Sequence, residues 1–246
     1  MNEKDFASML REKEGSININ ERQRYATQSA FGVLMRKVYV WMALALVITG
    51  LAAYYVAHSG FIFTMLGNPV LFWGLIIGEL ALVIGLSAAI NKLSLTTATL
   101  MFVLYSVVNG ITLSTIFLAY TQSSITQVFL ITAGTFGAMA VLGYTTKKDL
   151  SSMGKYLLMA LIGLIIATLV NLFFKSSGLD MALSYLGVLI FVGLTAYDSQ
   201  KIKLMCSSFE YADESAQKLA LLGALTLYLD FINLFIYLLR IFGKRE

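Results

Sequence analysis

The run LTLYLDFINLFIYLLRIFG, residues 225–243, is apolar enough to cross a bilayer as a helix, yet it carries a carboxylate, Asp230, near its middle. About twenty apolar residues are needed to span the hydrocarbon core. Six further runs of this kind precede it. The seven runs are roughly 38–57, 70–90, 98–119, 127–145, 155–174, 182–202 and 218–242. We therefore expect an all-α integral membrane protein with seven transmembrane helices.

The composition agrees with a membrane protein. Of 246 residues, 58% are hydrophobic and 13% are charged, whereas about a quarter of a soluble domain is charged. The long runs lack the strict alternation of a transmembrane β-barrel. With Cys206 as the one cysteine and a single histidine, no intramolecular disulfide is possible and metal catalysis lacks ligands. We expect no cofactor and no enzymatic activity.

The positions of the basic residues predict how the chain is oriented, because short cytoplasmic loops are rich in lysine and arginine. Most of them precede the first span or lie in the loops after the second, fourth and sixth spans: Lys4, Arg11, Lys13, Arg22, Arg24, Arg36, Lys37, Lys92, Lys147, Lys148, Lys155, Lys201, Lys203 and Lys218. We therefore expect a cytoplasmic N-terminus, with residues 1–30 as a polar cytosolic tail and 31–246 as the membrane domain. This topology explains the net charge of +4 without nucleic-acid binding.

Basic residues at the end of the chain conflict with this orientation. Arg240, Lys244 and Arg245 follow the last span. Either the last span crosses fully against the charge rule, or it enters the membrane and returns. We prefer a full crossing, because earlier spans usually dominate the orientation.

Three acids lie within the apolar runs, and no base lies deep in any of them: Glu79, Asp198 and Asp230. A charge at the bilayer centre costs at least about 2.5–3.5 kcal/mol. The acids can be protonated, can share a proton, or can be neutralised by a cation, and each outcome couples the site to pH or to cations. The plainer alternative is that each acid is neutral and simply hydrogen-bonds neighbouring helices.

Polar residues also recur at helical spacing, where residues three and four apart share a face. The last run carries such a stripe in Thr226, Asp230, Asn233 and Tyr237, and the third run carries another in Tyr105, Asn109 and Thr112. These stripes predict a bundle interior or a wet path.

The depths of two of the acids do not match. At 1.5 Å per residue, Asp230 lies about ten or more ångströms deeper than Asp198. The two side chains meet only if the sixth span extends past Lys201 or the seventh starts later than Lys218.

The sequence resembles the Bax-inhibitor-type family, the transmembrane Bax inhibitor motif proteins. TAYDSQKIK at 195–203, followed by the run at 225–243, carries the resemblance, while GELAL at 78–82 and NGITLSTIF at 109–117 resemble bacterial members. It covers the chain from about residue 30 to the end. The resemblance implies two three-helix layers around a central C-terminal helix. It further implies a pH-dependent calcium leak channel, in the inner (plasma) membrane if the protein is bacterial.

The resemblance also implies roles for particular residues. Asp198 and Asp230 correspond to a pH-sensing pair and a weak calcium site, whose apparent pKa values belong to the pair. A shared proton then holds the gate shut. Glu79 falls on the ion path, where Asn109 and Asn233 could supply further oxygen ligands. Lys92, in SAAINKLSL at 87–95, is the candidate latch where the family has an arginine, although lysine forms no planar bidentate clamp.

Two other functions stay open. The protein could be an adaptor that modulates a membrane-anchored AAA protease or another membrane complex, with the charged tail as contact. More distantly, Tyr197–Asp198 fits an intramembrane aspartyl protease, but Asp230 follows Leu-Tyr-Leu rather than Gly-x-Gly, and no proline follows Pro69. The partners expected are calcium, protons and the lipid bilayer, with a membrane protease under the adaptor hypothesis.

Overall fold

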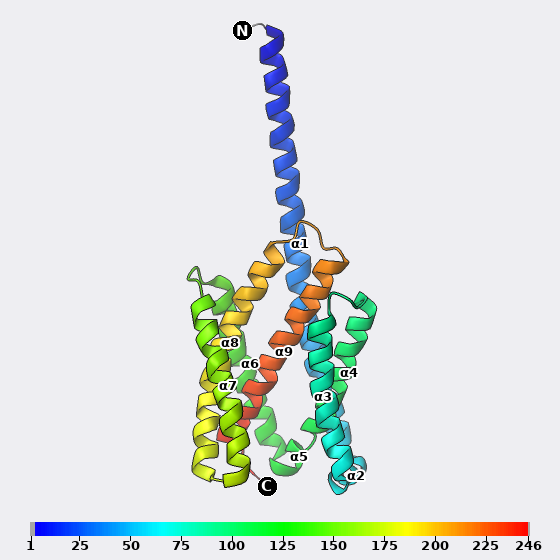
Figure 1. The fold of residues 1–246 in the computed structure, drawn as a ribbon, viewed down its shortest axis with the longest axis vertical. Helices are drawn as coiled ribbons and strands as arrows, with labels where there is room; N and C mark the ends of the chain where they lie inside the picture. The colour runs from blue at the N-terminus through cyan, green and yellow to red at the C-terminus, as the bar shows by residue number, and fades with distance from the viewer. Residues whose placement is uncertain (1–2, 246) are drawn as a thin grey trace.

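The computed structural model describes the backbone of residues 3–245 and the side chains of Glu21 and residues 24–245 (Figure 1). Its elements are α1 (Glu3–Ala57), α2 (Phe61–Gly67), α3 (Pro69–Ala89), α4 (Leu95–Leu113), α5 (Ile116–Ala119), α6 (Gln122–Thr145), α7 (Ser151–Phe174), α8 (Ser177–Ser207) and α9 (Glu214–Phe242). Seven segments of this described part are long and apolar enough to cross a membrane, with α4 and α5 together forming one of them. The prediction of seven helical spans is confirmed.

Polar residues that begin the helices mark the ends of the spans. Asn68 Oδ1 accepts hydrogen bonds from the N–H groups of Val70 and Leu71, and Pro69 occupies the first position of α3. Side-chain oxygens cap four further helices in the same way, those of Ser94, Thr121, Ser176 and Asp213. Such caps satisfy N–H groups that the first turn of a helix leaves without partners.

The spans form two layers of three on either side of α9. One layer holds α1, α3 and α4, and the other holds α6, α7 and α8, while α9 crosses diagonally between them (Figure 1). Within the bundle, 67% of the α9 span is buried, against 6% for α3 and for α7. The expected arrangement around a central C-terminal helix is confirmed.

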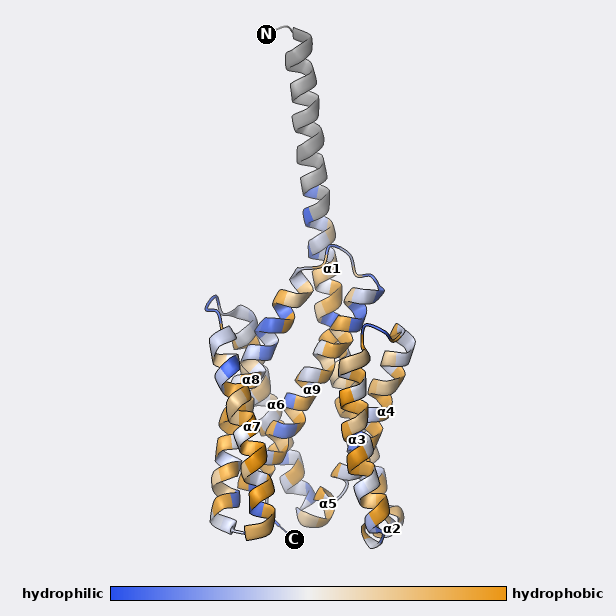
Figure 2. Cartoon of the chain, in the orientation of Figure 1, coloured by the Kyte–Doolittle hydropathy of each residue, from blue (hydrophilic) through white to orange (hydrophobic). Residues whose placement is uncertain are grey.

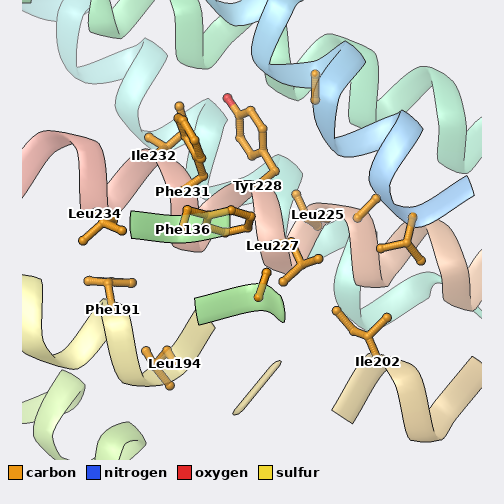
Figure 3. Close-up of a cluster of buried hydrophobic side chains, with 14 of the residues drawn as sticks. Phe136, Phe191, Leu194, Ile202, Leu225, Leu227, Tyr228, Phe231, Ile232 and Leu234 are labelled. Atoms are coloured by element: carbon orange, nitrogen blue, oxygen red, sulfur yellow. The ribbon is translucent and has the colours of Figure 1, made fainter. Parts of the chain in front are cut away.

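The sequence of α9 explains its central place. Buried side chains lie all around it, including Tyr228, Phe231 and Leu234, and they pack against Phe136 of α6 and Phe191 of α8 (Figure 3). In a bilayer apolar side chains need no protein around them, but polar side chains such as Asp230 and Asn233 do, and these favour a place for α9 inside the bundle. The outer helices are also rich in apolar residues (Figure 2), and many of these are exposed on the bundle, such as Ile77 of α3 and Ile162 of α7, as a bilayer requires.

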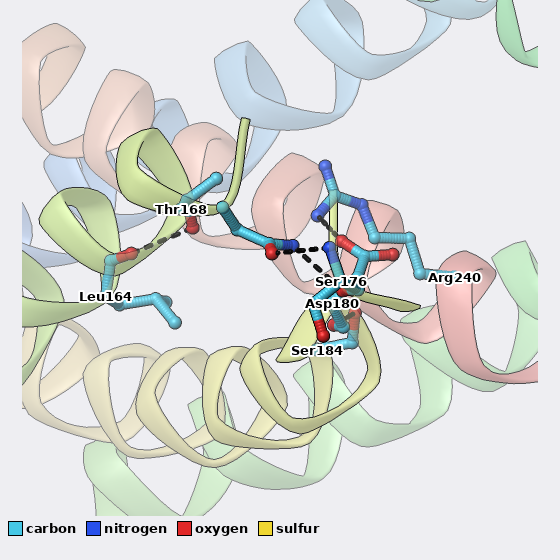
Figure 4. A network of polar contacts seen from close by, with 7 residues as sticks. Leu164, Thr168, Ser176, Asp180, Ser184 and Arg240 are labelled. Carbon is cyan, nitrogen blue, oxygen red and sulfur yellow. Dashed lines mark hydrogen bonds and ion pairs between the residues drawn. The ribbon is translucent and has the colours of Figure 1, made fainter. Parts of the chain in front are cut away.

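The last span crosses the bundle fully and does not return. α9 is one helix of 29 residues, about 43 Å long at 1.5 Å per residue, and the chain ends at the opposite end of the bundle from Glu214 (Figure 1). Arg240 forms an ion pair there with Asp180 of α8 at 3.5 Å (Figure 4). Lys244 O accepts a hydrogen bond from Thr121 N at 3.0 Å. The basic end of the chain is therefore held by protein groups at that face.

Gly143 allows α6 to approach the backbone of α8, and it provides a test of the fold. A Cβ atom at Gly143 would overlap the main-chain carbonyl of Ala196. We expect Gly143→Ala to destabilise the protein by about 1–3 kcal/mol, because the two helices must separate. Thermal unfolding in detergent measures this change. Gly137→Ala on the same helix is the matched control, because a Cβ atom there meets nothing within 4 Å; equal midpoints for the two variants would contradict the packing described.

Candidate functional site

Asp198 of α8 and Asp230 of α9 lie together inside the bundle, and we call them the carboxyl pair. Only 8% of Asp198 and 4% of Asp230 is exposed. Their carboxyl groups are within hydrogen-bonding reach of each other. The structure therefore brings together the two aspartates that depth counting had left apart.

The length of α8 removes part of the mismatch in depth. α8 continues past Lys201 to Ser207, beyond the end at residue 202 that apolarity predicts. Asp198 is therefore more than two turns from the end of its helix. This is the first of the two conditions under which the aspartates could meet.

Packing between α8 and α9 completes the alignment. Near one end the side chain of Ile202 rests against Gly223, and near the other the ring of Tyr237 lies over Gly187. Glycines at these two points let the helices approach closely. The carboxyl pair lies between the two contacts, so the antiparallel register of the helices is fixed on both sides of it.

No basic side chain forms an ion pair with the carboxyl pair in the described part of the chain, where the ion pair present is Arg240–Asp180. Lys201 lies one turn from Asp198, but its ammonium group is placed over the ring of Tyr197, 5.8 Å from the centroid. Lys92 is exposed in the loop between α3 and α4, and among the described residues it forms no ion pair with Asp198.

One carboxyl oxygen of the pair has no hydrogen-bond partner in the described part of the chain. No donor among the described groups reaches Asp230 Oδ2, and the neighbouring side chain is another carboxyl. Two ionised carboxylates are acceptors only, so a hydrogen bond between them requires that one of them is protonated. One shared proton would satisfy both groups.

A cavity of about 310 Å³ lies beside the carboxyl pair, between α7, α8 and α9. The polar stripe expected on α9 lines it, and the rest of the lining is mostly leucine and isoleucine. Its polar lining residues are Asp198, Thr226, Asp230, Asn233 and Tyr237. Carboxyl, amide and hydroxyl oxygens thus converge on one space in the membrane region.

Glu79 and Asn109 belong to a separate polar network between α3, α4, α1 and α9. Glu79 accepts hydrogen bonds from Asn109 Nδ2 and, at 3.0 Å, from Thr112 Oγ1. Tyr228 Oη donates to Asn109 Oδ1 at 2.7 Å and lies 2.7 Å from Thr49 Oγ1. The candidate ion-path residues are therefore divided, with Asn233 beside the carboxyl pair and these two in the other network.

α9 separates the two polar groups. Tyr228 and Asp230 are two residues apart, which places their side chains on nearly opposite sides of a helix.

No cluster of three or more acidic, histidine or cysteine side chains suited to a metal ion occurs among the described residues. Sequence reasoning missed Tyr228 and Thr49, whose roles depend on contacts between distant spans; the polar hydroxyl of Tyr228 in an apolar run was the available signal.

Comparison with known proteins gives a consistent match over the membrane domain. Residues 32–246 match the family described as inhibitor of apoptosis-promoting Bax1. The chain is similar to the inner membrane protein YbhL of Escherichia coli strain K12, with 54% identity over 214 residues that cover 86% of this chain and 92% of that protein. It is 38% identical over 225 residues to a membrane protein of Streptococcus pyogenes serotype M1, covering 89% and 97% of the two chains. A protein of Borreliella burgdorferi is 47% identical over 227 residues, covering 92% and 97%.

The hydroxyl of Tyr228 offers a test of the network that joins α9 to α1 and α4. Tyr228→Phe keeps the fully buried ring but leaves Asn109 Oδ1 without its donor. We expect a loss of about 1–3 kcal/mol in stability, the cost of a buried polar group that loses its partner. Thermal unfolding in detergent measures it. Tyr185→Phe on α8 is the control, because Tyr185 is 54% exposed; a midpoint no lower than that of the control would contradict the network.

Proposed function

Because the chain belongs to the Bax inhibitor-like family of multi-pass membrane proteins, we propose that it is a pH-sensitive calcium leak channel gated by the carboxyl pair. The observation that carries this proposal is the contact of two buried carboxyl groups, without a basic partner, at the edge of a polar-lined cavity. A purely structural pair of helices has no need of such an arrangement.

The proposed gate is the proton held between Asp198 and Asp230. With one proton shared, the pair carries a single negative charge, and its hydrogen bond ties α8 to α9. Without that proton, two negative charges face each other in a medium that screens them poorly. Their repulsion separates α8 from α9 and opens the cavity toward the centre of the bundle. The described state, with the carboxyls in contact and α9 buried, corresponds to the closed gate.

The proposed permeating ion is calcium, because the cavity offers oxygen ligands. Calcium takes six to eight oxygens and accepts carboxylate, amide and water ligands. The carboxyl pair and the Asn233 amide supply some of these, with waters completing the shell. Such a partial protein shell binds weakly, which suits passage rather than storage.

In this proposal the Glu79–Asn109 network is a second binding position along the ion path. The oxygens of Glu79 accept hydrogen bonds from Asn109 and Thr112, so they can serve an ion only after those bonds are released. Because Tyr228 links this network to α9, movement of α9 acts on both polar groups at once.

We also propose the orientation that the basic residues predict, with the N-terminus cytoplasmic and the protein in the inner membrane of a bacterium. The loops that follow α3, α6 and α8 lie at the same end of the bundle (Figure 1). Lys92, in the first of these loops, remains the candidate latch for a state in which α3 and α8 approach each other.

Calcium flux into proteoliposomes tests the gate from about pH 5 to about pH 8, a range over which a buried carboxyl pair can exchange a shared proton. Wild-type flux is expected to rise with pH, because loss of the proton separates the helices. In Asp198→Asn and Asp230→Asn, the amide donates to the remaining carboxylate, so no proton is shared between the two side chains. Each variant is therefore expected to lose the pH response and, at the upper end, to reduce flux roughly tenfold, equivalent to about 1.4 kcal/mol in the gating equilibrium.

Asp149→Asn is the matched control for these variants. Asp149 is exposed, and its carboxylate accepts a hydrogen bond from Ser151 N at 2.9 Å, an interaction that asparagine can replace. This variant should keep the wild-type pH profile. If wild type shows no flux at any pH, the channel proposal fails and the adaptor function is favoured. If the Asn variants of the carboxyl pair keep the wild-type profile, the pair is not the gate.

A further inference from the structure

A basic cavity of about 490 Å³ lies between the α6–α7 loop and α8, away from the carboxyl pair, and we call it the lysine pocket. Three lysines line it: Lys147, Lys148 and Lys203. The buried side chain of Gln200 fixes the loop onto α8, because it accepts from Leu150 N and donates to Lys148 O, both at 2.8 Å. The pocket is therefore preformed.

One acidic residue also lines the lysine pocket. Asp149 is fully exposed, and hydrogen bonds from the hydroxyl and N–H groups of Ser151 hold the pKa of its carboxyl below the ordinary value. The Asp149 carboxylate therefore interacts with Ser151 at the start of α7, and Lys155 of the same helix also lies close enough to interact with it. Against three lysines, a single carboxylate leaves the pocket with a net positive charge.

An apolar groove of about 410 Å³ lies between α1 and α6, and we call it the α1–α6 groove. It opens to the outside of the bundle, since Val141 in its wall is 62% exposed. Both of its walls are membrane spans, so the groove faces lipid. Its lining residues are Tyr39, Met42, Phe136, Gly137, Ala140, Val141 and Tyr144.

The lysine pocket and the α1–α6 groove adjoin at one contact. Lys203, which lines the pocket, donates a hydrogen bond from Nζ to the carbonyl oxygen of Tyr144 at 2.7 Å and lies 5.0 Å from the centroid of the Tyr144 ring. Tyr144 lines the groove. The lysine pocket at the end of the bundle thus borders the α1–α6 groove between two spans.

We propose that the lysine pocket and the α1–α6 groove together bind an anionic phospholipid of the bilayer. The phosphate lies among the three lysines, and one acyl chain lies in the groove. Basic pockets between transmembrane helices on the cytoplasmic side recognise anionic head groups, and an ammonium group has three donors, so Lys203 can bind phosphate while it holds Tyr144 O. A free phosphate ion would use the pocket but not the groove, and the position of the groove beside the pocket favours lipid. This site stands independently of the channel proposal.

Native mass spectrometry of the full chain in detergent tests the site, with dioleoyl phosphatidylglycerol and dioleoyl phosphatidylcholine as probes. Wild type should bind its first phosphatidylglycerol at least about tenfold more tightly than phosphatidylcholine, because each lysine near a membrane surface contributes roughly fivefold. Lys147→Gln combined with Lys148→Gln should remove this preference and leave phosphatidylcholine binding unchanged. Both side chains are exposed, so the double variant should fold.

A second variant tests the groove by itself. Gly137→Phe places a ring in the α1–α6 groove, where an added Cβ atom meets nothing within 4 Å, and should weaken the binding of both lipids. Gly134→Phe is its matched control, on the same helix with equally open space but outside the groove lining. Arg24→Gln combined with Lys92→Gln is the charge control, because both residues are exposed and neither lines the pocket.

The proposal is overturned by any of three results. Equal binding of the two lipids to wild type would show that the pocket does not select an anionic head group. A loss in the control variants as large as in the test variants would show diffuse charge or general lipid contact rather than a site. Displacement of phosphatidylglycerol by an equal concentration of inorganic phosphate would show a phosphate site in which the groove has no part.

Discussion

The contact between Asp198 and Asp230 is the interaction on which the central packing of the bundle depends, because both carboxyl groups are buried in the membrane region. Two unit charges about 4 Å apart interact with about 4 kcal/mol even at an effective dielectric constant of 20. Two ionised carboxylates that form no ion pair with a base among the described residues would therefore push α8 and α9 apart. A shared proton turns the same contact into a hydrogen bond. In the proposed gate the helix packing and the protonation of the pair are therefore linked, and Gly187 and Gly223 let the two helices pack closely on either side of the pair.

The remaining polar groups are arranged around the same central helix. α9 presents Tyr228 to the layer of α1, α3 and α4, where it joins the Glu79 network, and presents Asp230 to the layer of α7 and α8. A displacement of α9 that breaks one set of hydrogen bonds acts on the other through a rigid helix. Its ends are held as well, by the Asp213 cap at one end and by the Arg240–Asp180 ion pair at the other. The central helix is the mechanical link between two polar sites that share no side chain.

The surface of the bundle carries a different kind of chemistry. The lysine pocket and the α1–α6 groove are built by loop attachment and by a gap between spans, and neither involves the central carboxyls. Gln200 and Asp198 lie on the same helix, α8, two residues apart, so the helix that carries half of the carboxyl pair also anchors the loop of the lysine pocket. α8 thus contributes residues both to the carboxyl pair in the interior and to the lysine pocket at the surface.

The sequence by itself determined the number of spans and the presence of acids without bases, because span length and charge are properties of single segments. It also indicated the family through the motifs around Asp198 and Asp230. The central place of the last span was indicated by the family resemblance. Only the tertiary structure decided that these two carboxyls touch, that Glu79 and Asn109 lie in a separate network, and that Lys92 forms no ion pair with Asp198 among the described residues. Those outcomes depend on the length of α8 beyond its apolar run, on the tilt of α9 and on glycine contacts between helices. A residue's depth counted along one helix contains none of that information.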